Sequence, residues 1–395
     1  MSDGRYKSDD RSETYLRSKR VGESAVTDGG SDTTDVESET STGEDTNGTS
    51  QSAGSHDESV ASDSEDLVDA LLSGDHRALA RTITMIENRA PGYRELVSKL
   101  HRHAGDATVI GITGSPGAGK STLVDKLALA YRDEGLTVGI IAVDPSSPFT
   151  GGAVLGDRVR MRSTGGDMDV FVRSMSTRGS LGGLSPATAD AITALDAFGK
   201  DRILVETVGA GQNEVDVVRT ADTVAVLVQP GSGDDVQMLK AGILEIGDVF
   251  VVNKADLDGA DRTVRDLQEM LMLRGSDGAD VDQIDHSREE PWDPEIVETV
   301  ATAGEGVDEL YALFEAHAEF LDRTGLRERR RRERYAAKIR TLLREDAGAL
   351  IEGEIERRGG MDSLIEDVIT RETDPYAVAE SVLSPFEDAL EGRER

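Results

Sequence analysis

Apolar and polar positions alternate in different ways along this chain, and the changes in spacing divide it into segments. Residues 1–62 contain almost no large apolar side chain and are rich in Ser, Thr, Asp, Glu and Gly. Such a segment cannot bury enough surface to offset the entropy of ordering, so we predict a disordered acidic tail. Residues 63–106 carry apolar side chains at helical spacing, interrupted at Gly74 and Pro91. This pattern predicts an N-terminal helical extension of about three helices.

Residues 107–323 alternate short apolar runs with amphipathic segments. The runs predict strands at Val109–Thr113, Val138–Val143, Val170–Val172, Ile203–Glu206, Thr223–Val228, Val249–Asn253 and Ile296–Ala301. Helices are expected after Lys120, Ser185, Asn213, Asp234, Ala260 and Gly306. Continuously apolar strands joined by helices predict an α/β fold with a doubly wound, mostly parallel sheet. The polar stretch Arg274–Pro294 is expected to be a surface loop, and residues 324–395 a C-terminal helical arm.

The net charge of −33 narrows the choice of partners, because contact with nucleic acid phosphates requires a basic surface. A strongly acidic surface whose basic side chains are mostly arginine, with few lysines, suits a cytoplasm of very high salt, where charge repulsion is screened. The chain has no cysteine, which excludes disulfides and thiolate metal sites. No apolar run is long enough to span a membrane and the N-terminus has no apolar secretory core, so we expect a cytoplasmic protein.

One glycine-rich run fills every position of the G-x-x-x-x-G-K-[ST] pattern between a predicted strand and a predicted helix. Its residues are Gly114, Ser115, Pro116, Gly117, Ala118, Gly119, Lys120, Ser121 and Thr122. The glycines let backbone N–H groups turn toward an anion at the positive end of the helix dipole. Lys120 is expected to reach the β- and γ-phosphates and Ser121 to ligate Mg²⁺. The sequence therefore predicts a nucleoside triphosphate site.

A second motif, Asn253-Lys254-Ala255-Asp256, follows a predicted strand and matches the N-K-x-D guanine motif. The Asp256 carboxylate is able to accept hydrogen bonds from N1–H and the 2-amino group of guanine, which adenine cannot donate. A wrong base would leave that carboxylate unpaired, and this is an effective means of discrimination. We therefore expect a guanine nucleotide.

Carboxylates at other strand ends indicate the metal site. Glu206 ends one predicted strand and Gly209 follows it, as in a Walker B and switch II element, with Gly209 sensing the γ-phosphate through its N–H. Asp144 ends another strand, and Asp157 lies in the polar segment expected to serve as switch I. Carboxylates and a hydroxyl are the ligands that Mg²⁺ takes in proteins.

Two further features carry little chemistry. The basic run Arg327–Arg334 predicts an exposed helix with internal ion pairs, or an arm that grips an acidic partner subunit. His101 and His103 have no third ligand nearby, so we expect them to be solvent-facing.

These motifs together resemble the MeaB/ArgK/MMAA-type G proteins, in the SIMIBI branch of P-loop GTPases. The resemblance extends over about residues 65–390 and includes the runs beginning at Val143, Arg178, Glu206 and Pro230. It implies a homodimeric GTPase that acts as a chaperone for adenosylcobalamin-dependent methylmalonyl-CoA mutase, at its cobalamin-binding subunit, gating cofactor loading and reactivating the enzyme. It also implies catalytic and metal-site roles for Lys120, Asp144, Asp157 and Glu206, and a dimerisation role for the C-terminal arm. The resemblance further implies a third switch, made of Asp234, Gln237 and Lys240. It also implies a loop that contacts the base, made of Ala301, Thr302 and Ala303.

Three alternatives remain at this point. A metal-inserting GTPase of the same branch needs soft or imidazole ligands for its cargo, and this chain has no cysteine and only scattered histidines. A kinase linked to lysine, arginine or ornithine transport requires ATP, against which Asp256 argues. A nucleotide-gated scaffold that hydrolyses nothing is the third, because Arg158 and Arg160 are only candidates for an arginine finger.

Overall fold

The computed structural model describes residues 55–144, 167–176, 186–207, 220–231, 246–277 and 291–392, and the side chains within them except 55–63, 144, 176, 274–277 and 391. The chain divides into two compact units, residues 1–51 and residues 52–395. All of the described residues belong to the second unit, which is the subject of the following paragraphs. No helix in these ranges is both long enough and apolar enough to cross a bilayer.

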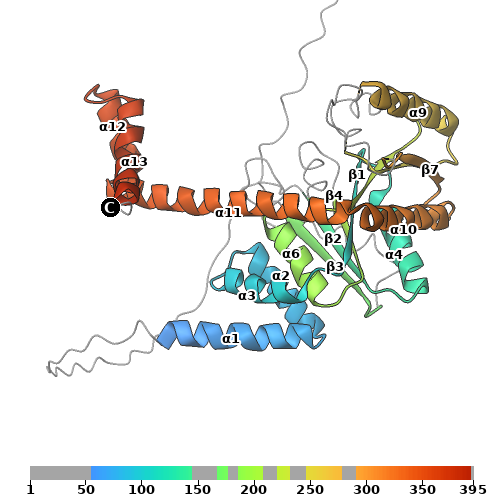
Figure 1. Cartoon of the computed structure of the whole chain (residues 1–395), viewed down its shortest axis with the longest axis horizontal. Coiled ribbons are helices and arrows are strands. Elements are labelled where there is room, and N and C mark those ends of the chain that lie inside the picture. Colours follow the sequence, from blue (N-terminus) through green and yellow to red (C-terminus); the bar gives the residue numbers. More distant parts are fainter. Residues whose placement is uncertain are drawn as a thin grey trace, which may run out of the picture. The chain divides into compact units, whose positions relative to one another are not determined.

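A seven-stranded sheet forms the centre of the second unit, in the order β3-β2-β4-β1-β5-β6-β7 (Figure 1). Each neighbouring pair of strands is parallel. The strands are β1 (Thr108–Gly114), β2 (Val138–Asp144), β3 (Val170–Ser176), β4 (Arg202–Thr207), β5 (Thr223–Val228), β6 (Val249–Asn253) and β7 (Glu295–Thr299). The predicted parallel sheet is confirmed, and each predicted run overlaps one of these strands, although β3 continues to Ser176 beyond its predicted end at Val172.

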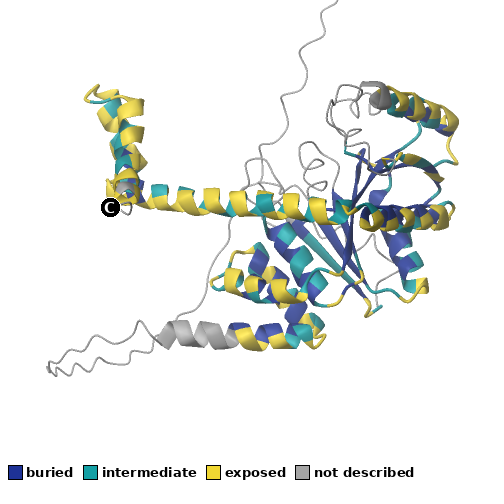
Figure 2. Cartoon of the chain, in the orientation of Figure 1, coloured by how far each residue is buried: buried dark blue, intermediate teal, exposed yellow. Residues whose placement is uncertain are grey.

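Both faces of the sheet are covered, and this is why inner strands such as β5 and β6 are nearly continuously apolar. Along β5, Val224 and Val226 belong to one buried cluster and Ala225 and Leu227 to the other. The first cluster includes apolar residues of α1 (Ser55–Leu72), α2 (His76–Glu87), α3 (Tyr93–Leu100) and α6 (Pro186–Ala197). The second includes those of α4 (Lys120–Asp133) and α10 (Val307–Thr324). Figure 2 shows these buried residues gathered in the sheet and on the inward faces of its helices.

The helices that precede the sheet are α1 (Ser55–Leu72), α2 (His76–Glu87), α3 (Tyr93–Leu100) and the 3₁₀ turn η1 (His101–His103). They confirm the predicted three helices, and both histidines of the turn are exposed as expected. The prediction that the tail reaches residue 62 is wrong at its end, because α1 already begins at Ser55. Once Leu67, Val68 and Leu71 fix the helix by packing into the core, extending it through polar residues needs no new nucleation.

The expected loop at Arg274–Pro294 also needs correction, because α9 (Ala260–Asp277) continues into it. Its other end includes Trp292, whose indole Nε1–H donates to the carbonyl of Asp248 at 2.8 Å. The ring lies against His317 with 4.6 Å between the ring centroids. This indole anchors the chain to the base of β6 before β7 begins.

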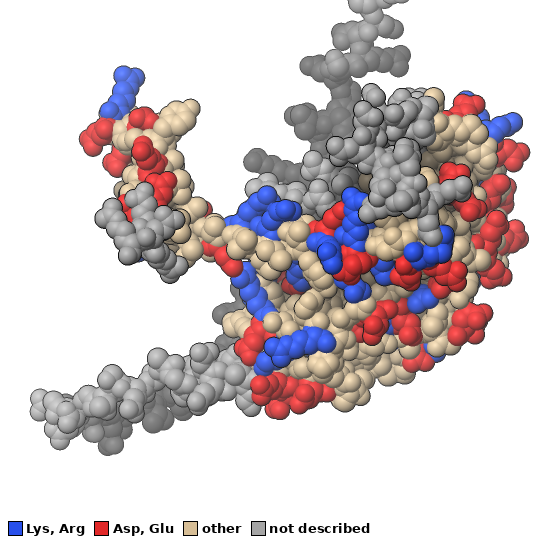
Figure 3. All heavy atoms as spheres, viewed as in Figure 1, with Lys and Arg blue, Asp and Glu red and all other residues tan. Residues whose placement is uncertain are grey.

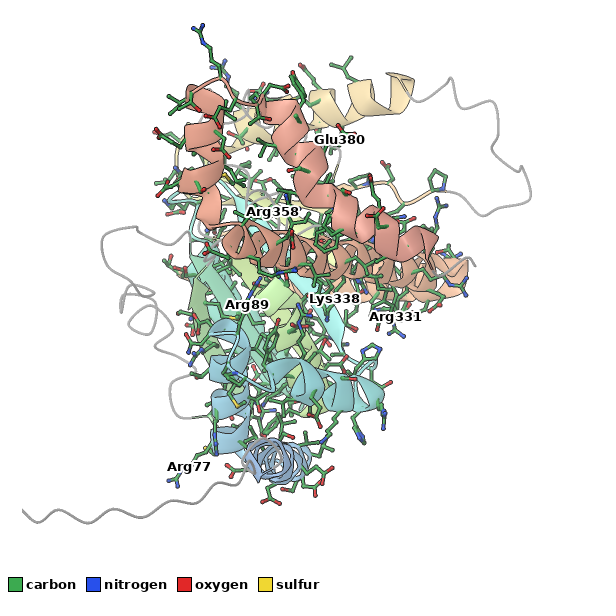
Figure 4. The ribbon with its side chains drawn as sticks, turned by 90° about the vertical axis from the view of Figure 1, so that its left-hand side faces the viewer. Arg77, Arg89, Arg331, Lys338, Arg358 and Glu380 are labelled. Atoms are coloured by element: carbon green, nitrogen blue, oxygen red, sulfur yellow. The ribbon has the colours of Figure 1, made fainter. Side chains whose placement is uncertain are left out.

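The C-terminal arm consists of α11 (Leu326–Arg357), α12 (Gly360–Ile369) and α13 (Pro375–Glu391). In Figure 4, Arg89, Arg331 and Lys338 mark where the first half of α11 passes the rest of the unit. Arg331 donates to the carbonyl of Gly105 at 2.5 Å. The Nζ of Lys338 lies 2.5 Å from a carboxylate oxygen of the buried Asp190, and Arg89 pairs with Glu345. The distal end of α11 packs instead on α13, where Arg358 donates to the carbonyl of Ser381.

The basic run at the start of α11 makes two kinds of ion pair. Arg329 with Glu333, and Arg332 with Glu328, form the predicted pairs within the helix. Arg327, Arg330 and Arg334 instead reach two acidic residues of their own chain, which lie immediately before β5 and β6. We call this group the strand-base cluster; it consists of Asp222, Asp248, Arg327, Arg330 and Arg334. Figure 3 shows basic side chains along α11 interleaved with acidic ones.

The two aspartates of the strand-base cluster also join neighbouring strands. Asp222 accepts a hydrogen bond from the Val109 N–H at the start of β1, and Asp248 accepts one from the Val224 N–H of β5. The buried His317 ring lies beside them and shares a 2.8 Å hydrogen bond with the Thr223 hydroxyl. Burial lowers the pKa of His317 to about 4, more than the opposing effect of the Asp248 carboxylate raises it. The imidazole is therefore neutral at pH 7, so the positive charges beside the two carboxylates are those of the arginines.

Candidate nucleotide-binding site

The candidate site lies at the carboxyl edge of the sheet, where open α/β folds bind their ligands. The glycine-rich run connects β1 to α4, and Glu206 lies near the end of β4. The guanine-type motif begins at Asn253, the last residue of β6, and Ala301 follows β7. Parallel strands bring these segments, which are far apart in the sequence, to one edge.

The glycine-rich run is fixed against β5. Ser115 N–H donates to the carbonyl of Leu227 at 3.1 Å, and Ala118 N–H donates back to the carbonyl of Ser115. Gly114 has φ +131°, and a Cβ at this position would lie 1.9 Å from the Leu227 oxygen. Gly117 and Gly119 also have positive φ values. Only glycine tolerates the approach at Gly114, so the first glycine of the motif is required by the packing of the loop on β5.

The lysine of the motif is already oriented by the loop itself. The Nζ atom of the buried Lys120 donates to the carbonyls of Gly114 at 2.7 Å and of Ser115 at 2.9 Å. These bonds hold the ammonium inside the curve of the loop at the N-terminus of α4. A phosphate held there meets a fixed positive charge, the helix dipole and backbone N–H groups together.

Two of the expected metal ligands lie next to each other. The Ser121 hydroxyl donates to Oε1 of Glu206 at 2.6 Å, and Glu206 is buried. A hydroxyl beside a buried carboxylate fits a small, hard cation such as Mg²⁺, which prefers oxygen ligands and keeps several of its waters. Among the described residues no cluster of three or more acidic, histidine or cysteine side chains forms a metal site. The pair therefore fits a cation that phosphate oxygens and water also ligate.

The guanine-type motif is held by its asparagine. The buried Asn253 amide donates to the carbonyl of Ala118 in the glycine-rich run at 2.6 Å. Its Oδ1 accepts bonds from the Thr299 hydroxyl at 3.0 Å and from the Ala301 N–H at 3.1 Å. One side chain thus ties together the phosphate loop, β6 and the segment after β7. The two predicted motifs form one structural unit through this residue.

Beyond Asn253 the chain turns sharply. Lys254 has φ +62°, and its carbonyl accepts the Leu257 N–H. Ala255 N–H donates to the carbonyl of Thr299 at 3.0 Å. Asp256 is exposed, and no hydrogen bond or ion pair ties it to another side chain in the described ranges. Its carboxylate is available to a ligand from solvent.

The predicted base-contacting loop lies beside this turn. β7 ends at Thr299 and not at Ala301 as predicted, because the chain turns at Val300 and Ala303 N–H donates back to its carbonyl. Ala301 is buried, whereas Thr302 and Ala303 are exposed. The turn is what brings the Ala301 N–H to Asn253.

Several predicted residues lie outside the described residues. They are Asp157, Arg158, Arg160, Gly209, Asp234, Gln237 and Lys240, and of Asp144 only the backbone at the end of β2 is described. Two contacts at the site have no counterpart in the sequence analysis. The Thr207 hydroxyl donates to that of Thr113 at 3.1 Å, and the Gln229 carboxamide accepts from Lys254 at 2.8 Å. Gln229 and Thr113 belong to none of the motifs described above, so only the register of the strands could reveal these contacts.

Comparison with known proteins agrees with this geometry. The family model described as methylmalonyl-CoA mutase-associated GTPase MeaB matches residues 79–354. A Pyrococcus abyssi protein that carries the name of a GTPase is 49% identical over 322 residues, which cover 81% of this chain and 95% of that protein. The GTPase ArgK of Escherichia coli is 34% identical over 61% of this chain and 72% of its own length.

The mouse methylmalonic aciduria type A homolog is 34% identical over 62% of this chain and 60% of its own length. Among solved structures, one titled LAO/AO transport system kinase superposes with a TM-score of 0.56 and 22% identity, over 82% of this chain and 98% of that one. This last likeness concerns the fold alone. With a parallel P-loop sheet and a family match over more than half its length, the chain belongs to the MeaB family of GTPases.

Proposed function

We propose that this GTPase is a chaperone of adenosylcobalamin-dependent methylmalonyl-CoA mutase, and that it gates cofactor loading and reactivates the mutase. The observation that carries the proposal is the match of residues 79–354 to the mutase-associated family model. The mouse relative, named for methylmalonic aciduria, is consistent with the same metabolic client. We propose the cobalamin-binding subunit of the mutase as the partner, and we propose no binding to nucleic acid or to a membrane.

The proposed reaction is hydrolysis of GTP to GDP and phosphate. Lys120 holds the β- and γ-phosphates from within the glycine-rich loop, and Asp256 accepts the guanine N–H groups. Ser121 and Glu206 hold Mg²⁺, with Asp144 and Asp157 as the further acidic residues proposed for its coordination. When bound, Mg²⁺ neutralises charge that develops on the phosphate oxygens. Gly209 is proposed to sense the γ-phosphate, and Asp234, Gln237 and Lys240 to relay the nucleotide state to the mutase.

The protein is proposed to work as a homodimer through its C-terminal arm. Tyr335, Ile339, Leu343 and Leu350 are exposed and lie on one face of α11. The helices α12 and α13 are acidic, contain no basic residue, and expose apolar side chains of their own. A second copy offers an acidic, partly apolar surface to the basic half of α11, which favours reciprocal pairing of two arms.

The arm predicts a test of the oligomeric state. Replacing Leu343, which is 64% exposed, with aspartate should shift sedimentation equilibrium from dimer toward monomer by at least about tenfold in dissociation constant. The matched change Leu257→Asp, at an exposed leucine outside the arm, should leave the dimer intact. A monomeric wild-type protein, or equal effects of the two changes, would contradict the arm as the dimer interface.

The client is tested by GTP turnover in concentrated KCl, with and without the mutase of the same organism. We expect a slow basal rate, a several-fold rise when the mutase is added, and a complex that depends on the nucleotide. High salt is the relevant condition because the net charge of −33 is proposed to reflect a halophilic cytoplasm. The Asp256→Asn variant is the control, and it should lose guanine preference by about tenfold because one hydrogen-bond partner of the base is removed. Absence of both complex and stimulation would assign a different client.

A transport-linked kinase is the second candidate, because relatives bear the names ArgK and LAO/AO transport system kinase. That function requires transfer of phosphate from ATP to a protein or small molecule. The same assay with labelled ATP distinguishes the two, since a kinase would label an acceptor and retain activity in Asp256→Asn. Insertion of a soft metal is disfavoured by the absence of cysteine in the whole sequence.

A further inference from the structure

The loop that carries Asp256 is held by contacts from three other parts of the site. Asn253 binds the carbonyl of Ala118, and Ala255 N–H binds that of Thr299. The third contact is made by side chains alone: Lys254 Nζ donates to Oε1 of Gln229 at 2.8 Å. In the part of the chain that the structure describes, this is the hydrogen bond that fixes the Lys254 ammonium.

The backbone conformation of Lys254 is strained, so a hydrogen bond that restrains its side chain has an effect on the loop. Its φ of +62° lies in the left-handed region, which costs an L-residue about 1 kcal/mol. The same backbone makes the turn closed by the Leu257 N–H, and Asp256 lies inside that turn. A hydrogen bond that fixes the Lys254 side chain therefore opposes relaxation of the backbone that aims the Asp256 carboxylate.

The position of Gln229 suits it to accept this hydrogen bond from Lys254. It is the first residue after β5, is half-buried, and precedes Pro230. A residue before proline is restricted to extended conformations, so the direction of the Gln229 side chain is limited. Two residues earlier on β5, the Leu227 carbonyl accepts the Ser115 N–H of the phosphate loop. The end of β5 thus contacts both the phosphate loop and, through Gln229, the guanine loop.

From this geometry we propose that Gln229 is a positioning residue for guanine selectivity, acting through Lys254 on the loop that presents Asp256. It touches no substrate in this account. The inference rests on the proposed binding of guanine nucleotide at this site and adds a residue that belongs to none of the recognised motifs.

The test is nucleotide affinity of the full chain in concentrated KCl, measured by competition of GDP and ADP against a fluorescent guanine nucleotide. Gln229→Ala should weaken GDP binding about fivefold, the loss of one hydrogen bond, and leave ADP binding unchanged. Gln229→Glu keeps an acceptor for the ammonium and should retain wild-type selectivity. Gln268→Ala, at an exposed glutamine of α9, is the matched control and should change neither affinity.

A second background separates positioning from a purely structural effect. If Gln229 acts through Lys254, then Gln229→Ala should have no further effect on selectivity in a Lys254→Met protein. Equal effects in both backgrounds, or equal losses of GDP and ADP affinity, would overturn the proposal while leaving the proposed function intact. A wild-type protein without guanine preference would overturn both, and this is visible before any variant is made.

Discussion

Replacing Arg330 with alanine should lower the free energy of unfolding by about 3 kcal/mol, because it leaves the largely buried Asp248 carboxylate without its cationic partner. Arg330 binds both carboxylate oxygens of Asp248, at 2.9 and 3.1 Å, and also donates to the carbonyl of Asp222. The Asp248 side chain is only 11% exposed, so water cannot replace the guanidinium fully. The effect should persist in concentrated KCl, since salt screens buried pairs much less than exposed ones.

The matched control for this change lies two residues further along the same helix. Arg332 is 80% exposed and pairs only with Glu328 one turn away, a contact that contributes about 0.5 kcal/mol or less. Thermal or urea unfolding of Arg330→Ala and Arg332→Ala at several salt concentrations measures the difference. Equal stabilities of the two variants would mean that the strand-base cluster does not hold the arm to the sheet.

The strands of this protein were readily predictable from its sequence, and the reason is physical. Both faces of the sheet are covered, so inner strands such as β5 and β6 are nearly continuous apolar runs bounded by polar turns. The predicted bounds of β5 and β6 agree with the structure residue for residue. β7 is partly exposed at the edge of the sheet, and here the prediction ran two residues too far.

Long-range pairing of charges was not predictable in the same way. The sequence shows that the run Arg327–Arg334 is basic, but not which acidic residues it pairs with. Whether these lie in the same helix, at the sheet or in another subunit depends on the angle at which α11 leaves α10. Gly325, with φ +69°, sets that angle. Asp222 and Asp248 stand in the sequence as isolated acidic residues before apolar runs, with no signal that they accept arginines from more than 80 residues away.

In the candidate site, the motifs predicted which residues meet, and the structure adds how they are held. Ser121, at the start of α4, and Glu206, near the end of β4, are adjacent, as their expected roles at one metal site implied. The sequence assigned Asn253 to the guanine motif, whereas the structure shows it bonded to the phosphate loop and to Ala301. Such contacts follow from strand order, because β1, β5, β6 and β7 are neighbours in the sheet although loops and helices separate them in the chain.

The close approach of the phosphate loop to β5 leads to the second prediction with a large expected effect. Gly114→Ala should weaken guanine nucleotide binding by more than about 100-fold, because overpacking and positive φ each cost about 1–3 kcal/mol. The new Cβ would lie 1.9 Å from the Leu227 carbonyl oxygen, a backbone atom that also accepts the Ser115 N–H. The strain can be relieved only by moving the loop off β5, which disperses the N–H groups and the carbonyls that hold Lys120.

Gly117→Ala separates the clash from the backbone strain. Gly117 also has a positive φ, +76°, but no atom lies within 4 Å of a Cβ placed there. Its replacement should therefore cost the conformational strain alone, about 1–2 kcal/mol, and reduce affinity by about tenfold. Titration of both variants with GDP, alongside their unfolding curves, gives the comparison. GDP affinities of the two variants that agree within about threefold would show that contact with β5 does not shape the loop for phosphate. The site would then be held together through Asn253 and Lys254 alone.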